Sequence, residues 1–420
     1  MEIATWETAL AAEWDHKRAA DAQPPLLPLA SLSIGHEELI DAVRVLLSGQ
    51  LTMGAVVREF EREFAKFIGS PYAVMVNSGS SANLLAVAVA CNFRRENALQ
   101  PGDEVLVPSL CWSTSVAPLL QHGLKPIFLD IDPQTLNVQS GEIARKLTPR
   151  TRAIFAVHVL GNCGPMDEIL QAARDHNLLL IEDTCESLGS MWRDKYLGAA
   201  GQLGTYSFFF SHHMTTGEGG MVICQEKADY ELLLCLRAHG WTRELSDRPA
   251  WEAANPGVDP RFLFVNVGYN VRPVEIEAAI GLCQLRKLPA MNAARVANRT
   301  ALIDALRGHS AWRGQLEFPH AAENSSPVWF GFPFIVAGDE RVDMRQFAQR
   351  LSGEGVENRP IVSGNFARQP VLRDLGLDIR ATDYPGAERA TDRGLFISLP
   401  STILSPDTIA LVADVLLTSL

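Results

Sequence analysis

The stretch Ser207-Phe208-Phe209-Phe210-Ser211-His212-His213-Met214-Thr215-Thr216-Gly217-Glu218-Gly219-Gly220 decides how the chain is interpreted. The apolar run from Tyr206 to Phe210 predicts a β-strand that ends in a polar turn. The glycine pair at 219–220 predicts a sharp change of direction, and the residues from Met221 to Cys224 predict a second strand. The polar turn that contains His212 therefore lies between two strands.

Short apolar segments alternate with helical patterns on the N-terminal side of this stretch. Helices are predicted at 80–91, 112–121, 139–146 and 165–175. Strands are predicted at 72–76, 104–107, 125–129, 152–157, 178–182 and 205–210. This alternation is typical of an α/β fold whose mostly parallel sheet is covered by helices on both faces.

Three parts are predicted along the chain. Residues 1–48 form an N-terminal helical segment, and residues 49–285 form a large domain that opens with a helix at 56–67. A helix from 272 to 288, which continues to about residue 308, closes this domain. Residues 286–420 form a smaller α/β domain, with strands at 328–336 and 395–398 and helices at 342–353 and 405–418.

Composition excludes several classes of protein. The net charge of the 420 residues is −12, which argues against nucleic-acid binding, because phosphate backbones are bound by basic surfaces. No apolar run reaches the roughly eighteen residues that cross a bilayer, and residues 1–23 lack an apolar signal core, so a cytoplasmic protein is expected. The seven cysteines stand singly, which predicts reduced thiols and neither a metal site nor an iron–sulfur cluster.

Two motifs after predicted strands have the composition of a ligand site. In Asn77-Ser78-Gly79-Ser80-Ser81-Ala82-Asn83 a glycine turn opens a helix, whose first N–H groups and neighbouring hydroxyls form an anion cradle or an ordinary serine-capped helix start. Trp112 follows the next strand, where it either stacks on a flat ring or simply packs at a helix start.

A third motif, Leu178-Leu179-Leu180-Ile181-Glu182-Asp183, delivers a carboxylate at the end of an apolar strand. Asp183 is either the partner of a protonated heterocyclic nitrogen or a helix N-cap. The order of the motifs favours a single site, because a hydroxyl-rich loop, an aromatic residue, a strand-end Asp, Ser207 and position 212 all emerge from one edge of one sheet.

The sequence Ser207-Phe208-Phe209-Phe210-Ser211, followed by a glycine-rich segment, resembles the motif with which the DegT/DnrJ/EryC1/StrS family presents a Schiff-base lysine to pyridoxal phosphate. His212 stands at the position of that lysine. The resemblance implies the fold of aspartate aminotransferase, known as fold type I. It also implies that Ser80, Ser81 and Ser207 bind the cofactor phosphate, that Trp112 stacks on the ring, that Asp183 pairs with the pyridine nitrogen and that Glu186 lines the ring edge.

The segment Gly268-Tyr269-Asn270-Val271-Arg272 resembles the part of that family that reaches across a dimer. Asn270 would touch the phosphate of the partner's cofactor, so the resemblance implies a homodimer with a shared active site.

Two further segments are similar to the sugar 3-dehydratase branch of the family: His212-His213 with the glycines after it, and Gly364-Asn365-Phe366-Ala367-Arg368-Gln369-Pro370. This branch uses pyridoxamine phosphate to remove the C3 hydroxyl of a nucleotide-linked 4-keto-6-deoxy hexose. His212 would move the proton, ammonia would be released, and L-glutamate would restore the pyridoxamine form. Only Cys235 and Cys283 follow Cys224, which favours the route without an iron–sulfur cluster.

The contacts to the sugar nucleotide and to glutamate are predicted at cationic or polar side chains. The candidates are His213, Arg243, Arg272, Arg359 and Arg368, since an arginine fork matches a phosphate or a carboxylate. Each arginine is alternatively a surface charge or part of a salt bridge. Two other functions stay open: a nucleotide-sugar aminotransferase that leaves the amine on its product, and a noncatalytic homologue that only binds the cofactor.

Overall fold

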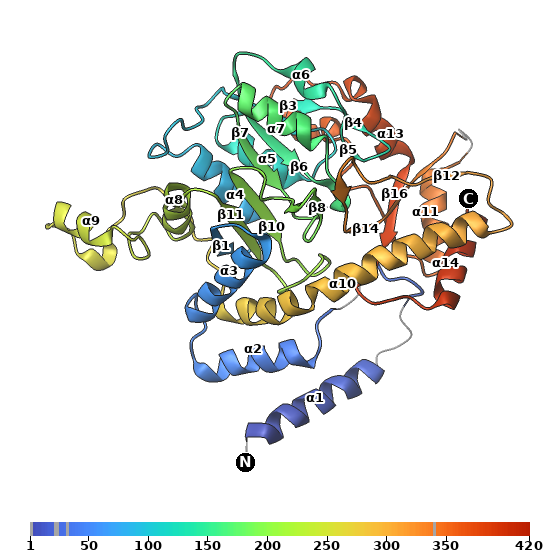
Figure 1. The fold of residues 1–420 in the computed structure, drawn as a ribbon, viewed down its shortest axis with the longest axis horizontal. Coiled ribbons are helices and arrows are strands. Elements are labelled where there is room, and N and C mark those ends of the chain that lie inside the picture. Colours follow the sequence, from blue (N-terminus) through green and yellow to red (C-terminus); the bar gives the residue numbers. More distant parts are fainter. Residues whose placement is uncertain (1–2, 21–24, 31–32, 339–341) are drawn as a thin grey trace.

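The computed structural model describes residues 3–20, 25–30, 33–338 and 342–420 of the chain. A seven-stranded sheet lies at its centre (Figure 1). Its strands, in spatial order, are β1 (Tyr72–Val76), β11 (Gly220–Cys224), β10 (Leu203–Ser207), β7 (Leu179–Asp183), β6 (Thr151–Val157), β2 (Glu104–Pro108) and β3 (Lys125–Leu129).

Most strands of this sheet run parallel. β11 is antiparallel to both of its neighbours, β1 and β10, whereas the pairs from β10 to β3 are all parallel. The prediction of a mostly parallel sheet is therefore confirmed. Because β10, β7, β6 and β2 share one direction, their carboxyl ends meet at a single edge of the sheet.

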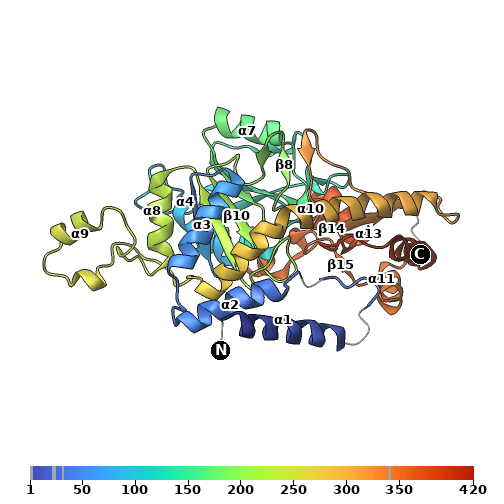
Figure 2. The same cartoon turned by 60° about the horizontal axis from the view of Figure 1, so that its bottom comes forward.

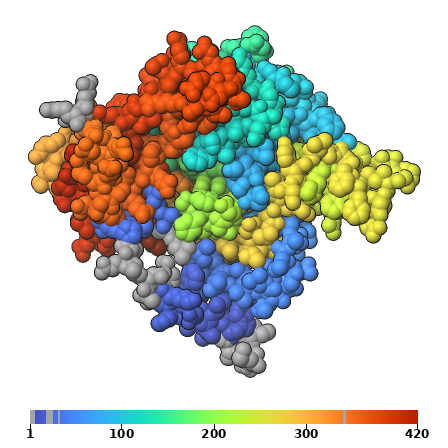
Figure 3. Space-filling view, turned by 180° about the vertical axis from the view of Figure 1, so that it is seen from behind, coloured from blue at the N-terminus to red at the C-terminus, as the bar shows by residue number. Residues whose placement is uncertain are grey.

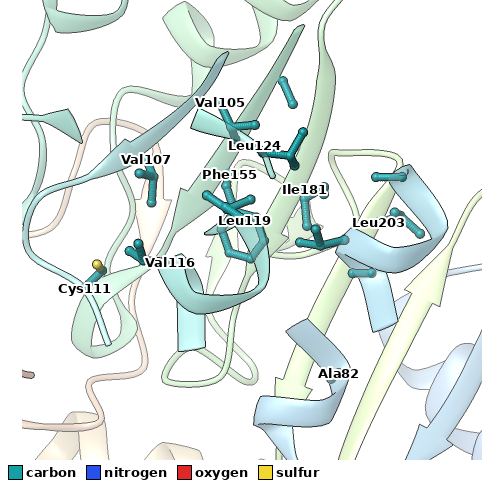
Figure 4. Packing of buried hydrophobic residues seen from close by; sticks show 14 of the residues in the cluster. Ala82, Val105, Val107, Cys111, Val116, Leu119, Leu124, Phe155, Ile181 and Leu203 are labelled. Atoms are coloured by element: carbon teal, nitrogen blue, oxygen red, sulfur yellow. The ribbon is translucent and has the colours of Figure 1, made fainter. Parts of the chain in front are cut away.

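Helices cover both faces of the sheet, as alternating side chains on each strand require. On one face, α4 (Gly79–Ala90), α5 (Ser113–Gln121) and α8 (Lys227–Arg237) pack on strand residues such as Val107, Phe155 and Ile181 (Figure 4). The other face is covered by α3 (Ala55–Ile68), α6 (Glu142–Lys146), α7 (Met166–Asp175) and the first half of α10 (Glu275–Gly308).

The C-terminal part has its own hydrophobic core around a four-stranded sheet. The strands of that sheet are β12 (Leu316–Glu317), β14 (Gly331–Val336), β16 (Gly394–Ser398) and β15 (Asn358–Pro360). Its helices are α11 (Met344–Gly353), α12 (Pro370–Asp374), α13 (Pro385–Arg393) and α14 (Pro406–Thr418). The second half of α10 packs into this core through Leu302 and Leu306. Since α10 is continuous across residues 285 and 286, the expected domain boundary falls inside a helix and remains a prediction.

Two peripheral elements complete the fold. The helices α1 (Ile3–Ala20) and α2 (His36–Ser48) lie side by side, and α2 packs on α10 (Figure 2). The segment from Trp241 to Val267, which contains α9 (Arg248–Ala254), projects from the body of the molecule (Figures 1 and 3). Among the described residues, no helix combines the length and the apolar character needed to cross a membrane.

The predicted strand at 205–210 is wrong at its end. β10 stops at Ser207, where the chain turns so that Phe208 N–H donates to Gly219 O at 2.9 Å and Thr216 N–H donates to Phe208 O at 2.9 Å. Apolar residues continue past this turn without pairing in the sheet, and Phe209 and Phe210 remain 46% and 39% exposed. Apolar character alone therefore extends the prediction beyond the last strand residue.

Candidate active site

A cavity of about 410 Å³ opens at the edge where β2, β6, β7 and β10 end. Six of the predicted site residues line it: Ser80, Trp112, Asp183, Glu186, Ser207 and His212. They come from four separate segments of the chain, which the sheet order brings together. Residues of the three motifs and position 212 therefore line one cavity, and their role as a ligand site remains a prediction.

Asp183 ends β7 and is held by hydrogen bonds from three groups. Its Oδ2 accepts from Asn83 Nδ2 and Ser115 Oγ, each at 2.8 Å, and its Oδ1 accepts from Cys185 N–H at 3.2 Å. Thr205 Oγ1 donates to Asn83 Oδ1 at 2.6 Å, which leaves the amide nitrogen of Asn83 to face the carboxylate. Asp183 is 4% exposed and forms no salt bridge with any described residue. This fixed anion is suited to a cationic group in the cavity.

The start of α4 forms one end of the cavity. Ser78 caps the helix by accepting Ser81 N–H at 3.1 Å, and the first N–H groups of a helix have no acceptor within it. A Cβ at Gly79 would lie 2.4 Å from Ser207 Cβ, so only glycine permits this close approach. Ser80 and Ser207 line the cavity, whereas the Ser81 hydroxyl accepts a hydrogen bond from Ser78 Oγ at 3.0 Å and does not line it.

His212 lies in the turn after β10 with its ring fixed at one nitrogen. Nδ1 is 2.6 Å from Cys185 O, and because a carbonyl only accepts, Nδ1 carries the proton and Nε2 keeps a lone pair. The ring packs edge-on against Phe330 with the centroids 5.0 Å apart. Burial, with a contribution from the Arg295 charge, lowers the pKa of His212 to about 4. The imidazole is therefore neutral at pH 7.

Lysine is absent from the wall of this cavity among the described residues. The two lysines nearest in sequence to His212 are Lys195, which is exposed in β9 (Lys195–Tyr196), and Lys227, which starts α8 beyond β11. Any cofactor with an aldehyde would thus be bound here without a covalent bond to a lysine of this chain.

Glu186 and Trp112 complete the predicted set. Burial raises the pKa of Glu186 to about 7, although Leu160 N–H donates to its Oε2 at 2.9 Å. Leu160 has a left-handed backbone with φ of 51°, which is a strained conformation for a residue other than glycine. The residue that orients Glu186 is therefore itself strained. Trp112 is 55% exposed at the start of α5 and forms an open wall of the cavity.

The remaining predicted contacts lie outside this cavity. His213 is buried with Nε2 at 2.9 Å from Val328 O. Arg368 forms salt bridges to Glu388 and Asp392, each at 2.7 Å.

Two other cavities contain the rest of the predicted set. Asn270, Arg243 and Arg272 line a cavity of about 560 Å³ near the starts of α3 and α10, and Arg272 Nε donates to Asn270 Oδ1 at 2.9 Å. Arg359 lines a cavity of about 420 Å³ that adjoins the one containing His212. None of these three arginines lines the cavity of His212.

Sequence reasoning missed the residues that orient Asp183. Asn83 stands within a motif that was singled out and Ser115 follows Trp112 closely, but no sequence signal showed that they reach Asp183 across neighbouring strands. His158 was also missed; it lines the cavity, and its Nε2 lies 3.0 Å from Glu182 Oε2. Among the described residues, no cluster of three or more His, Cys, Asp or Glu side chains is placed to hold a metal ion.

The profile of the DegT/DnrJ/EryC1/StrS aminotransferase family matches residues 32–416. The chain belongs to this family. A relative from Escherichia coli O55:H7, named GDP-4-keto-6-deoxy-D-mannose 3-dehydratase, is 40% identical over 373 residues, which are 88% of this chain and 94% of the relative.

Solved structures extend the similarity to the whole fold. The E. coli GDP-4-keto-6-deoxy-D-mannose 3-dehydratase with bound hydrated PLP superposes with a TM-score of 0.86 at 38% identity, over 94% of this chain and all of that one. A GDP-4-keto-6-deoxymannose 3-dehydratase with a trapped PLP-glutamate geminal diamine superposes with a TM-score of 0.83 at 37% identity, over 93% and 100%. The expected aminotransferase-like fold is therefore confirmed.

Proposed function

We propose that this member of the family is a pyridoxamine-phosphate-dependent sugar 3-dehydratase. Its substrate would be a nucleotide-linked 4-keto-6-deoxy hexose, of which GDP-4-keto-6-deoxymannose is the example named for the 40% identical relative. L-glutamate would supply the amine. The observation that carries the proposal is the neutral His212, with Nε2 unprotonated, in a cavity whose described wall contains no lysine.

The residues of the cavity fit the cofactor. Asp183 is a buried carboxylate without a cationic partner among the described residues, which suits a protonated pyridine nitrogen. Ser80, Ser207 and the N-terminal turn of α4 offer hydroxyl and N–H donors to a phosphate. Trp112 offers a flat face to the ring, and Glu186 offers a carboxyl group at its edge.

The chain's own groups account for the proton transfers. Pyridoxamine phosphate, when bound, would supply an amine for the C4 ketone and a ring that takes up the electrons released by proton removal and returns them as the C3 hydroxyl leaves. His212 accepts a proton at Nε2, while Cys185 O holds Nδ1–H and thereby fixes the ring. The proton that His212 accepts would then pass to the leaving oxygen of the C3 hydroxyl. An imidazole forms no stable imine, so it does not compete with the substrate for the cofactor.

The cavity of Asn270 and Arg272 supports a homodimer with a shared site. These residues face a separate cavity from His212, as expected if they reach the site of a second copy. Each protomer would then supply Asn270 to the partner's phosphate cradle. Location in the cytoplasm remains a prediction of the sequence.

The exchange His212→Lys tests the role of His212. We expect deoxygenation of GDP-4-keto-6-deoxymannose with glutamate to fall by about 10²- to 10⁴-fold, as measured by mass spectrometry of the product. The same exchange at His176, which is exposed after α7, is the matched control and should leave the rate unchanged. A full deoxygenation rate in His212→Lys would contradict the proposal.

Two further measurements separate the alternatives. Borohydride treatment of the wild-type protein loaded with PLP should trap no adduct, whereas a Schiff-base lysine would be trapped. Nitrogen in the sugar product would identify an aminotransferase. Failure to convert glutamate and PLP to 2-oxoglutarate and pyridoxamine phosphate would identify a noncatalytic homologue.

A further inference from the structure

Arg295 carries a buried charge that no described residue neutralises. It lies in the middle of α10 and is 6% exposed. Its Nη1 donates to Phe330 O at 2.8 Å, but Nε has no hydrogen-bond partner and no described carboxylate forms a salt bridge with the guanidinium. Burial without a counter-ion lowers the pKa of Arg295 to about 10, so the group remains charged at neutral pH.

Another buried arginine shows the usual arrangement. Arg237 is 1% exposed, and its guanidinium donates to Glu61 and Glu244 at 2.5 Å and 3.1 Å. A buried cation without such a partner costs stability, because its hydration is lost and nothing replaces it. Nε of Arg295 has no partner, and the edge formed by Nε and Nη2 is one with which an arginine binds a carboxylate through two parallel hydrogen bonds.

Arg295 lines a cavity of about 420 Å³ next to the one that contains His212. The two cavities share Phe209, Ser211 and Phe330 in their walls, and the Phe330 ring contacts His212. The second cavity is also lined by Arg359 from β15, while Glu357, the one carboxylate among the described residues of its wall, accepts Leu29 N–H at 2.7 Å. The described wall therefore presents two guanidinium groups beside the proposed site of proton transfer.

We propose that Arg295, together with Arg359, binds a carboxylate of the amino-acid amine donor. This inference rests on the proposed function, because it requires a donor whose amine enters the cavity of His212. An amino acid keeps its carboxylate only a few bonds from its amine, so the carboxylate lies in that cavity or in a space that adjoins it. The diphosphate of a sugar nucleotide offers the same anionic chemistry, and the experiment separates the two sources.

The test compares Arg295→Met and Arg295→Lys with a matched control on the same helix. Arg299 lies one turn further along α10, packs its guanidinium 4.3 Å from the Trp329 ring and also has a buried Nε without a partner, but it lines neither cavity. Binding of glutarate, a dicarboxylate without an amine, and of GDP to the cofactor-loaded proteins is measured by calorimetry. The glutamate concentration that gives half the maximal rate of pyridoxamine phosphate formation is measured in parallel.

We expect Arg295→Met to weaken glutarate binding and to raise the half-saturating glutamate concentration, each by about tenfold or more, with GDP affinity unchanged. Arg295→Lys keeps the charge but not the two-pronged contact, so an intermediate loss is expected even if the methionine variant folds poorly. Arg299→Met should behave as the wild type. Unchanged glutarate binding in both Arg295 variants, or a loss confined to GDP, overturns the inference.

The result is independent of the sugar reaction. A wild-type protein that binds glutarate through Arg295 but leaves the C3 hydroxyl in place would refute the proposed function and keep the carboxylate site. Deoxygenation by the wild type, together with unaltered glutamate dependence in the Arg295 variants, would keep the proposed function and refute the carboxylate site.

Discussion

Asp183 and Arg295 are two buried groups that line adjoining cavities, and they differ in how their hydrogen-bonding capacity is filled. Asp183, at the sheet edge, accepts bonds from Asn83, Ser115 and Cys185. Arg295, on α10, makes one bond to a carbonyl. The Asp183 carboxylate is held in position before any ligand arrives, whereas the hydrogen bonds of the Arg295 guanidinium are completed only when a ligand binds.

This difference matches two kinds of occupant. A group that stays bound through many turnovers benefits from a rigid partner that needs no rearrangement. A substrate that enters and leaves benefits from a partner whose own bonding is incomplete, because each binding event then removes an unfavourable buried charge. The sheet edge is accordingly suited to the cofactor, and the α10 wall to an exchanging anion.

Asp183→Asn tests the buried carboxylate at the sheet edge and should have the largest effect of these exchanges. The exchange removes the negative charge and turns an amide toward donors that need an acceptor, so pyridoxamine phosphate affinity should fall by about 3 kcal/mol or more, roughly a hundredfold. Fluorescence titration of the cofactor-free protein measures this. Asp194→Asn, on the exposed turn between β8 (Met191–Trp192) and β9, is the control. Unchanged affinity would show that Asp183 does not face the pyridine nitrogen.

Glu186→Gln tests the sheet edge through the pH dependence of the unfolding free energy. With its folded-state pKa raised to about 7, Glu186 keeps its proton while the unfolded chain releases it from about pH 4.5 upward. Its contribution to stability is therefore complete below about pH 4.5 and is lost as the pH rises to about 7.

The cofactor-free wild type should lose roughly 1 to 3 kcal/mol of unfolding free energy from this source between pH 4.5 and 7.5. Urea denaturation at several pH values should show a smaller loss in Glu186→Gln, whose amide oxygen still accepts Leu160 N–H. Equal pH dependence in both proteins would contradict the raised pKa.

Arg368→Ala should have the smallest effect. Unlike Arg295, Arg368 is already paired, with Glu388 and Asp392, at a partly exposed position. Removing such a surface pair costs about 0 to 1 kcal/mol of unfolding free energy, and glutamate saturation should change less than in Arg295→Met. Thermal unfolding and glutamate saturation curves measure both quantities. A tenfold rise in the half-saturating glutamate concentration would instead support the substrate contact predicted from the matched segment at 364–370.

The sequence predicted those features that depend on local pattern. β1 was predicted at its observed bounds, 72–76, because an apolar run between a glycine and a polar turn leaves little choice. Asp183 was predicted because it stands at the end of an apolar strand of a parallel sheet, and His212 because it occupies the lysine position of the motif that the sequence resembles.

Features that depend on the order of strands could not be predicted. Asn83 lies on α4, which follows β1, and it contacts Asp183 although β11 and β10 lie between β1 and β7. Ser115 lies on α5, which follows β2, and it contacts Asp183 although β6 lies between β2 and β7. The burial of Arg295 could not be predicted either, because an isolated arginine in a long helix usually faces solvent. Only the packing of α10 against Phe330 shows that it is buried.

The continuity of α10 has a mechanical consequence. Its first half is anchored in the core beneath the large sheet by Leu285 and Leu288, and its second half in the C-terminal core by Leu302 and Leu306. Arg295 lies between these two anchored halves, and Pro289, which lies inside the helix between Leu288 and Arg295, donates no backbone hydrogen bond. Both cores therefore fix the position of Arg295, and Phe330 links α10 to the turn after β10, because its carbonyl accepts from Arg295 and its ring packs against His212.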